Sequence, residues 1–160
     1  MIRLALISFW LGAATPTTAL ADPAIASFNA VCFKAGQTAS EARARMAARD
    51  GTPLPHALTF WDKTLEPAPD TIAEIERRCE VAFDGEHTTK AIAALRAQMA
   101  TPPVFGFKID LPHTHAPEPG TVLIEGRDLL RGRVAVVHVG TRDNRTYMAV
   151  DRLPVGWEAF

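Results

Sequence analysis

Two histidines in one loop are the residues whose spacing most directly suggests chemistry. His113 and His115 are separated by one threonine in a proline-rich stretch. In an extended backbone, side chains two positions apart point to the same side, so both imidazoles are able to bind one metal ion such as zinc or copper. A zinc site takes three or four protein ligands, so others must come from elsewhere in the chain. The candidates are His87 and His138, with Glu86 and Glu118 as carboxylates.

A plainer interpretation of these histidines stays open. An H-x-H pair is also typical of a solvated loop, and a histidine on a valine-rich strand, such as His138, is often a buried residue with a hydrogen-bond partner. The spacing alone does not decide between a metal site and these structural roles.

A local excess of arginine is the second feature of the sequence that suggests chemistry. The arginines gather in the last third of the chain, where Arg131, Arg133 and Arg145 predict a site for an anion. The planar guanidinium suits carboxylate and phosphate groups. The alternative is a solvated sheet face, on which interspersed acidic residues pair with these arginines.

Several function classes are excluded by what the sequence lacks. After residue 21 the only serines are Ser27 and Ser40, and neither lies in a G-x-S-x-G or S-x-x-K motif. The chain has no glycine-rich phosphate loop. Its net charge of −1 provides no basic excess for binding nucleic acid. The sequence therefore leaves the question of an enzyme open and favours a binding protein.

The N-terminal segment predicts export. Arg3 precedes an apolar run over residues 4–14, and Ala19 and Ala21 form an A-x-A cleavage site. We therefore expect a cleavable secretory signal peptide at 1–21 and a domain at 22–160; an uncleaved anchor is the alternative. No later run is long enough to span a membrane, so the predicted location is periplasmic or secreted.

The chain contains two cysteines, Cys32 and Cys79. An even count behind a secretory signal predicts a disulfide, and these two residues form the only intramolecular pair. A redox role is the alternative, but the sequence lacks the C-x-x-C spacing that such a pair prefers.

Hydrophobic periodicity, caps and turn residues then predict the elements that must position these side chains. Helices are expected at 23–34, 38–48 and 88–100. Strands are expected at 57–63, 77–83, 121–126, 133–139 and 145–151, with a weaker one at 104–109. Segment 133–139 is apolar on both faces, which predicts a central strand.

Helices followed by strands, with one helix among them, predict an α+β fold. We expect a single small domain in which an antiparallel sheet of four to five strands carries two to three helices on one face. The predicted function is a secreted or periplasmic, non-enzymatic binding or envelope accessory protein, whose partner is an unknown protein or small ligand. The alternative is a metal-binding protein or metal-assisted hydrolase that uses the His113/His115 loop.

Overall fold

A computed structural model describes residues 21–67, 74–101 and 106–157 of the 160-residue chain. The predicted signal peptide lies outside the described residues except for Ala21, as do residues 104 and 105 of the weak predicted strand. Within the described ranges, no helix has the length and apolar character needed to cross a membrane.

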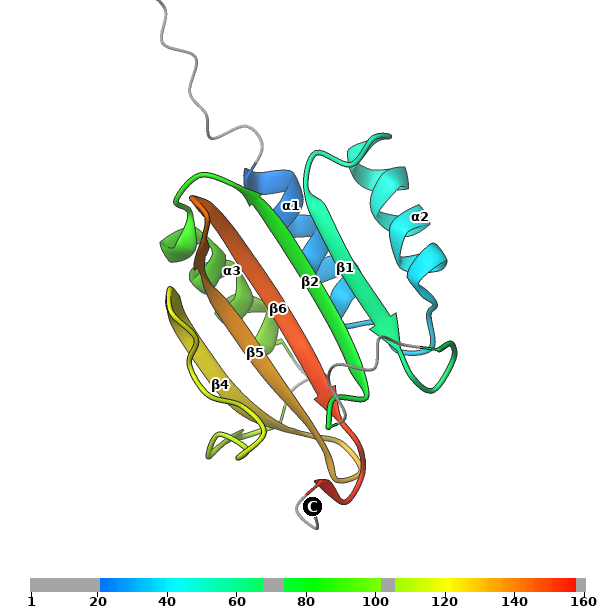
Figure 1. The fold of residues 1–160 in the computed structure, drawn as a ribbon, viewed down its shortest axis with the longest axis vertical. Coiled ribbons are helices and arrows are strands. Elements are labelled where there is room, and N and C mark those ends of the chain that lie inside the picture. The colour runs from blue at the N-terminus through cyan, green and yellow to red at the C-terminus, as the bar shows by residue number, and fades with distance from the viewer. Residues whose placement is uncertain (1–20, 68–73, 102–105, 158–160) are drawn as a thin grey trace, which may run out of the picture.

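One antiparallel sheet forms the centre of the fold (Figure 1). Its strand order is β1-β2-β6-β5-β4-β3, and every neighbouring pair is antiparallel. The strands are β1 (Ala57–Asp62), β2 (Arg77–Asp84), β3 (Lys108–Ile109), β4 (Thr121–Leu129), β5 (Arg133–Arg142) and β6 (Arg145–Leu153). As predicted, β5 lies inside the sheet, between β6 and β4.

The predicted α+β class is confirmed, and the predicted number of strands was too low. The sheet has six strands rather than four to five. The strand of least certain signal, β3, contributes only two residues, which pair with Arg127 and Gly126 of β4. The sequence indicated it only as the weak strand over residues 104–109, because two residues show little of the alternation that identifies a strand.

Helices cover one face of this sheet, which we call the helix face. They are α1 (Ala21–Ser27), which continues as the π-helix η2 (Phe28–Cys32), α2 (Ala39–Asp50) and α3 (Thr88–Met99). In Figure 1, α1 and α3 lie behind the sheet. Helix α2 begins with a capping box, in which Thr38 accepts from the Glu41 amide and Glu41 accepts from the Thr38 amide.

The main core lies between the helices and this face. Alternation along the strands sends every second side chain towards the helices. On the helices, Phe28, Met46 and Leu95 are fully buried in this core. The strand residues of this core include Cys79, Val81, Val137, Val139, Met148 and Val150. The predicted disulfide is confirmed: Cys32 and Cys79 are bonded and join η2 to β2.

The opposite face, which we call the loop face, is covered in part by the connection between β3 and β4, residues 110–120. Two glycines allow this close approach. A Cβ atom at Gly126 would lie 2.9 Å from the carbonyl oxygen of Asp110, and one at Gly140 would collide with the carbonyl oxygen of Gly120. The connection therefore packs directly on β4 and β5, carrying the His113/His115 pair with it.

Candidate metal centre

Two polar residues of adjacent central strands meet on the loop face. His138 lies between Val137 and Val139 in β5, and Asp151 follows Val150 in β6. The three valines belong to the core on the helix face, so alternation directs His138 and Asp151 to the loop face. Asp151 pairs in register with Val136, which makes it a diagonal neighbour of His138.

The β3–β4 connection adds a third residue, His115. Its Nε2 donates a hydrogen bond to Asp151 Oδ2 over 3.2 Å, and His138 Nε2 lies 3.3 Å from the same oxygen. The side chains of His115, His138 and Asp151 are only 4%, 10% and 0% exposed. Their three ligand atoms lie within 4.8 Å of one another. The arrangement is thus a buried cluster of two imidazoles and one carboxylate.

Asp151 is held in its ionised form. Burial by itself raises the pKa of a carboxyl group, but the contacts with His115 and His138 and the charge of Arg78 outweigh it and lower the pKa of Asp151 to about 2. Arg78 is the register partner of Asp151 on β2, and its Nε lies 3.0 Å from Oδ1. One carboxylate oxygen therefore faces the arginine and the other faces the imidazoles.

The hydrogen bonding of this cluster is incomplete. His138 Nε2 is buried and has no hydrogen-bond partner in the described part of the chain, because its contact with Asp151 is not aligned as a hydrogen bond. His115 is better supported, since its Nδ1 lies 2.7 Å from the hydroxyl of Thr114. A hydrogen bond to the far nitrogen of this kind orients a metal-binding imidazole.

The separations suit a metal ion. In a tetrahedral site with bonds of about 2.0 Å, neighbouring ligand atoms are roughly 3.3 Å apart. The distances from Asp151 Oδ2 to the two imidazole nitrogens, 3.2 and 3.3 Å, match this separation between neighbouring ligand atoms. All three ligand atoms lie within 4.8 Å of one another, so binding of an ion would require the two rings, whose centroids are 5.4 Å apart, to move closer together. Imidazole and carboxylate together suit zinc and copper.

Of the four histidines proposed from the sequence, the structure brings His115 and His138 together. His113 instead stacks on Trp157, with ring centroids 6.3 Å apart, and His87 stacks on Phe83 at 6.0 Å. Neither belongs to the cluster. The two candidate carboxylates also have other contacts: Glu86 accepts from Thr88, and Glu118 pairs with Arg142.

Sequence reasoning missed Asp151 as a ligand. The only indication in the sequence was its position: Asp151 is an acidic residue that directly follows the apolar run from Tyr147 to Val150. Such a residue is typical of a strand end, so the signal becomes clear only when burial is known: Asp151 is 0% exposed. A fully buried carboxylate needs a partner, and its partners here are Arg78 and the two imidazoles.

The three arginines proposed as an anion site lie apart. Arg131 has a φ of 69° in the turn between β4 and β5. Arg145 pairs with Asp84 and donates to the carbonyl oxygen of Ala82. Arg133 lines a cavity on the helix face, together with two arginines that the sequence did not single out.

Comparison with known proteins adds no assignment. No protein-family model matches the chain, and a search of curated proteins finds no match. The chemistry of this cluster must therefore be inferred from its geometry.

Proposed function

We propose that this chain is an exported binding protein that holds one divalent transition-metal ion, zinc or copper, between His115, His138 and Asp151. The observation that carries the proposal is His138 Nε2, a buried ring nitrogen without a hydrogen bond, 3.3 Å from a buried carboxylate oxygen. A metal ion between these atoms satisfies both.

A metal explains this cluster better than a purely structural role. Leaving a buried polar atom unpaired costs about 1–3 kcal/mol, and proteins avoid this cost where they can. The low pKa of Asp151 keeps its carboxylate ready to bind at neutral pH without releasing a proton. Arg78 contacts the carboxylate of Asp151, and Thr114 contacts the ring of His115. Partners of this kind orient the ligands in metal sites.

The proposal is one of binding rather than hydrolysis. Three protein ligands leave a coordination position for water, which a metal-assisted hydrolase also needs. A hydrolase further needs a cleft for its substrate beside the ion. The cavities lined by Arg133, by Arg142 and by Trp157 do not include any of the three ligands. We keep the non-enzymatic role predicted from the sequence as part of the proposal and assign its ligand as a metal ion.

Calorimetric titration tests the metal site. We expect the chelator-treated protein to bind one equivalent of zinc chloride or copper sulfate, and His115→Ala and His138→Ala to abolish binding. His113→Ala and His87→Ala are matched controls, because these histidines stack on aromatic rings outside the cluster, and they should bind as the wild type does. Circular dichroism verifies that each variant is folded.

Two results would overturn the metal site. One is the absence of stoichiometric binding of either ion by the folded wild-type protein. The other is binding that survives the loss of His115 and His138 but not the loss of His113 or His87.

Export is the second part of the proposal. It is supported by the predicted signal peptide at 1–21 and by the Cys32–Cys79 disulfide, a bond that persists in oxidising compartments. Mass spectrometry of protein recovered from a secreting host should give a chain that begins at Asp22 and is lighter by two hydrogen atoms. A chain that retains Met1 or has free thiols would contradict export.

A further inference from the structure

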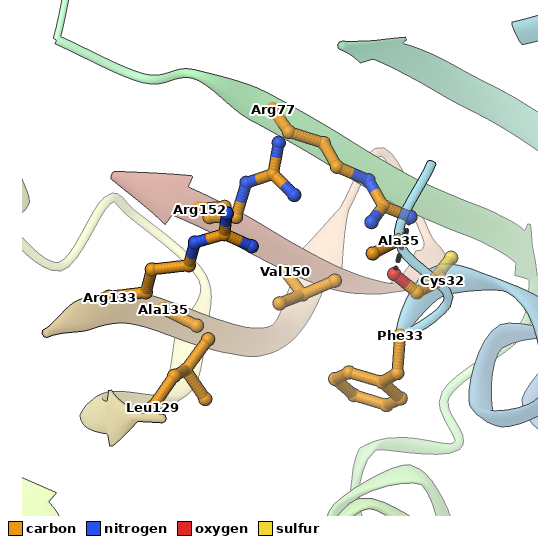
Figure 2. A pocket seen from close by; sticks show the side chains of 9 residues that line it. All are labelled: Cys32, Phe33, Ala35, Arg77, Leu129, Arg133, Ala135, Val150 and Arg152. Atoms are coloured by element: carbon orange, nitrogen blue, oxygen red, sulfur yellow. Dashed lines mark hydrogen bonds between the residues drawn. The ribbon is translucent and has the colours of Figure 1, made fainter. Parts of the chain in front are cut away.

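A second candidate site lies on the helix face. A cavity of about 120 Å³ opens there between the end of η2 and the strands β2, β4, β5 and β6. Figure 2 shows three arginine side chains around it, Arg77, Arg133 and Arg152. Arg77 and Arg152 are register partners on β2 and β6, and Ala135, two residues after Arg133, pairs with Arg152. The sheet therefore brings the three guanidinium groups to one place.

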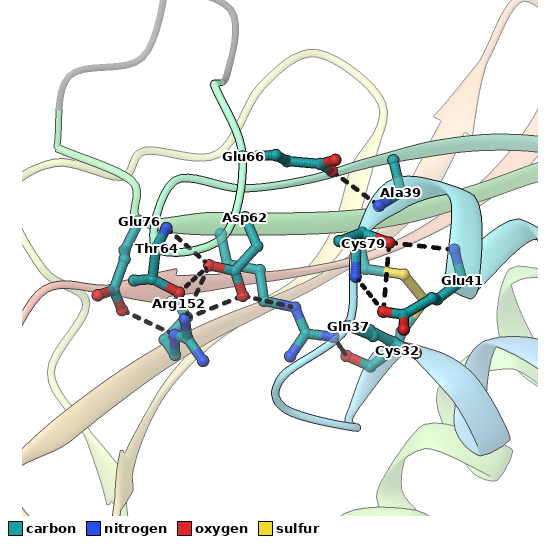
Figure 3. A network of polar contacts seen from close by, with 12 residues as sticks. Cys32, Gln37, Ala39, Glu41, Asp62, Thr64, Glu66, Glu76, Cys79 and Arg152 are labelled. Atoms are coloured by element: carbon teal, nitrogen blue, oxygen red, sulfur yellow. Dashed lines mark hydrogen bonds and ion pairs between the residues drawn. A yellow bond between two sulfur atoms is a disulfide. The ribbon is translucent and has the colours of Figure 1, made fainter.

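Two carboxylates, Glu76 and Asp62, are available to balance the charges of these three arginines. Arg152 pairs with Glu76 at 2.8 Å and with Asp62 at 3.1 Å (Figure 3). Arg77 lies 4.0 Å from Asp62 and donates to the carbonyl oxygen of Cys32. Arg133 is exposed, and it forms no ion pair or hydrogen bond with the described residues. The cavity is therefore left with one uncompensated positive charge.

Arg77 is a buried arginine that lies close to the positive charge of Arg152. Its side chain is only 7% exposed, and its Nε has no hydrogen-bond partner in the described ranges. Burial and the neighbouring charge of Arg152 lower the pKa of Arg77 to about 10, although Asp62 acts in the opposite direction. A pKa of about 10 leaves Arg77 charged at neutral pH, so an anion placed in the cavity is attracted by it.

The rest of the cavity wall is apolar. Phe33, Leu129, Ala135 and Val150 line it beside the arginines (Figure 2). Its volume of about 120 Å³ is close to that of an apolar cavity of about 150 Å³ that is known to hold benzene. The space therefore suits a small ring or a branched chain.

From the uncompensated positive charge and the apolar wall, we propose that the cavity binds a small organic carboxylate with an apolar body. Arg133 holds its carboxylate group. The single uncompensated charge matches a monoanion; an inorganic phosphate dianion would reverse the balance and place no group against Leu129 and Val150. A bidentate contact between guanidinium and carboxylate gives the orientation. This site is independent of the metal site, which lies on the opposite face of the sheet.

Titration of chelator-treated, full mature protein tests the proposal, with benzoate as the probe. Benzyl alcohol has the same ring without the charge, and inorganic phosphate has charge without the ring. We expect saturable binding of benzoate, and weaker or no binding of the other two. Because a hydrogen bond to a charged group is lost, Arg133→Gln should raise the Kd for benzoate about tenfold or more.

Two further variants separate the cavity from general surface charge. Arg131→Gln removes the same charge two residues away, outside the cavity lining, and should leave the Kd unchanged. Leu129→Trp fills part of the cavity without changing any charge and should weaken binding.

The proposal is overturned if benzoate does not bind saturably to the folded protein. It is also overturned if phosphate or benzyl alcohol binds as tightly as benzoate, or if Arg131→Gln weakens binding as much as Arg133→Gln does. Since no metal is present in these titrations, failure here is independent of the outcome at His115, His138 and Asp151.

Discussion

Asp151 is the residue on which the polar contacts of the loop face converge. Its side chain is completely buried between His115, His138 and Arg78, and all three contacts favour its ionised form. If this charge is removed, three partners lose their counterpart.

We expect Asp151→Asn to lower the free energy of unfolding by about 3 kcal/mol at pH 7, because it leaves the Arg78 charge uncompensated. The folded pKa of about 2 lies below the value of about 3.9 in unfolded chains. The contribution of the ionised carboxylate is therefore complete above about pH 4 and is lost as the pH falls towards 2.

Urea unfolding followed by circular dichroism, at pH 7 and at pH 2.5, measures both effects. Asp143→Asn is the control, because Asp143 lies in the exposed β5–β6 turn with a φ of 50°, which asparagine also tolerates. A loss of stability of equal size in both variants at pH 7 would refute the role given to Asp151.

His56 is a second buried ionisable residue, and it predicts a different pH dependence. Its side chain is 0% exposed, and its Nδ1 lies 3.7 Å from Asp50 Oδ2. Burial lowers the pKa of His56 more than Asp50 raises it. The unfolded chain then binds a proton at about pH 6.5 before the folded chain does, so the free energy of unfolding falls as the pH decreases below about 6.5.

Comparison of the wild-type protein with His56→Phe isolates this effect from the other histidines. Phenylalanine fills a similar volume without titrating. We expect the loss of stability between pH 7.5 and 5.5, measured by urea unfolding, to be smaller in the variant. An unchanged pH dependence would mean that His56 does not titrate differently on folding.

At the scale of elements, the β3–β4 connection brings His115 to the proposed metal site. His115 is the only one of the three ligands outside the sheet, and its position depends on residues 110–120 lying flat on β4 and β5. Gly126 permits this approach, because a Cβ atom there would lie 2.9 Å from the Asp110 carbonyl oxygen and 3.2 Å from Pro112 Cδ.

Gly126→Ala should therefore push the connection away from the sheet. We expect a loss of about 1–3 kcal/mol of stability from overpacking, and a decrease of about tenfold or more in metal affinity as His115 is displaced. Calorimetric titration with zinc and urea unfolding measure the two effects. Val122→Ala in the same strand, 61% exposed, should change neither. Unchanged zinc affinity in Gly126→Ala would show that the connection does not position His115.

At the scale of the whole molecule, the disulfide ties the N-terminal helices to the sheet. Cys32 ends η2 and Cys79 lies in β2, 47 positions later. Closing a loop of this length in the unfolded chain stabilises the folded state by about 4 kcal/mol in the chain-entropy model. This is a large fraction of the 5–15 kcal/mol that is usual for a protein.

We expect the double variant Cys32→Ala/Cys79→Ala to unfold at a markedly lower urea concentration than the oxidised wild type. The wild-type protein under strong reductant is the second measurement, since it removes the bond without removing the side chains. If all three samples unfold at the same urea concentration, the disulfide does not contribute to stability as proposed.

Strand β6 links the two proposed sites across the sheet. Asp151 and Arg152 are consecutive, and alternation sends Asp151 to the loop face and Arg152 to the helix face. One strand thus provides a proposed metal ligand on one side and an arginine of the proposed anion cavity on the other.

Much of the fold follows from local patterns in the sequence. The helix beginning at the Thr38 capping box, the strands 77–83 and 133–139, and the pairing of the only two cysteines were predicted and are confirmed. These features depend on a few neighbouring residues, or on a count, so no knowledge of the tertiary structure is needed. The two-residue β3 was predicted only as part of a weak strand over residues 104–109, because so short a segment shows little alternation.

The composition of both sites was decided only by the tertiary structure. The sequence indicated His115, His138 and Arg133, but Asp151, Arg77 and Arg152 emerged from the strand order, which places β6 between β2 and β5. Alternation tells which residues share a side of one strand; it does not tell which strands are neighbours. Contacts such as that of His115 with Asp151, 36 positions apart, exist because packing of the whole chain brings them together.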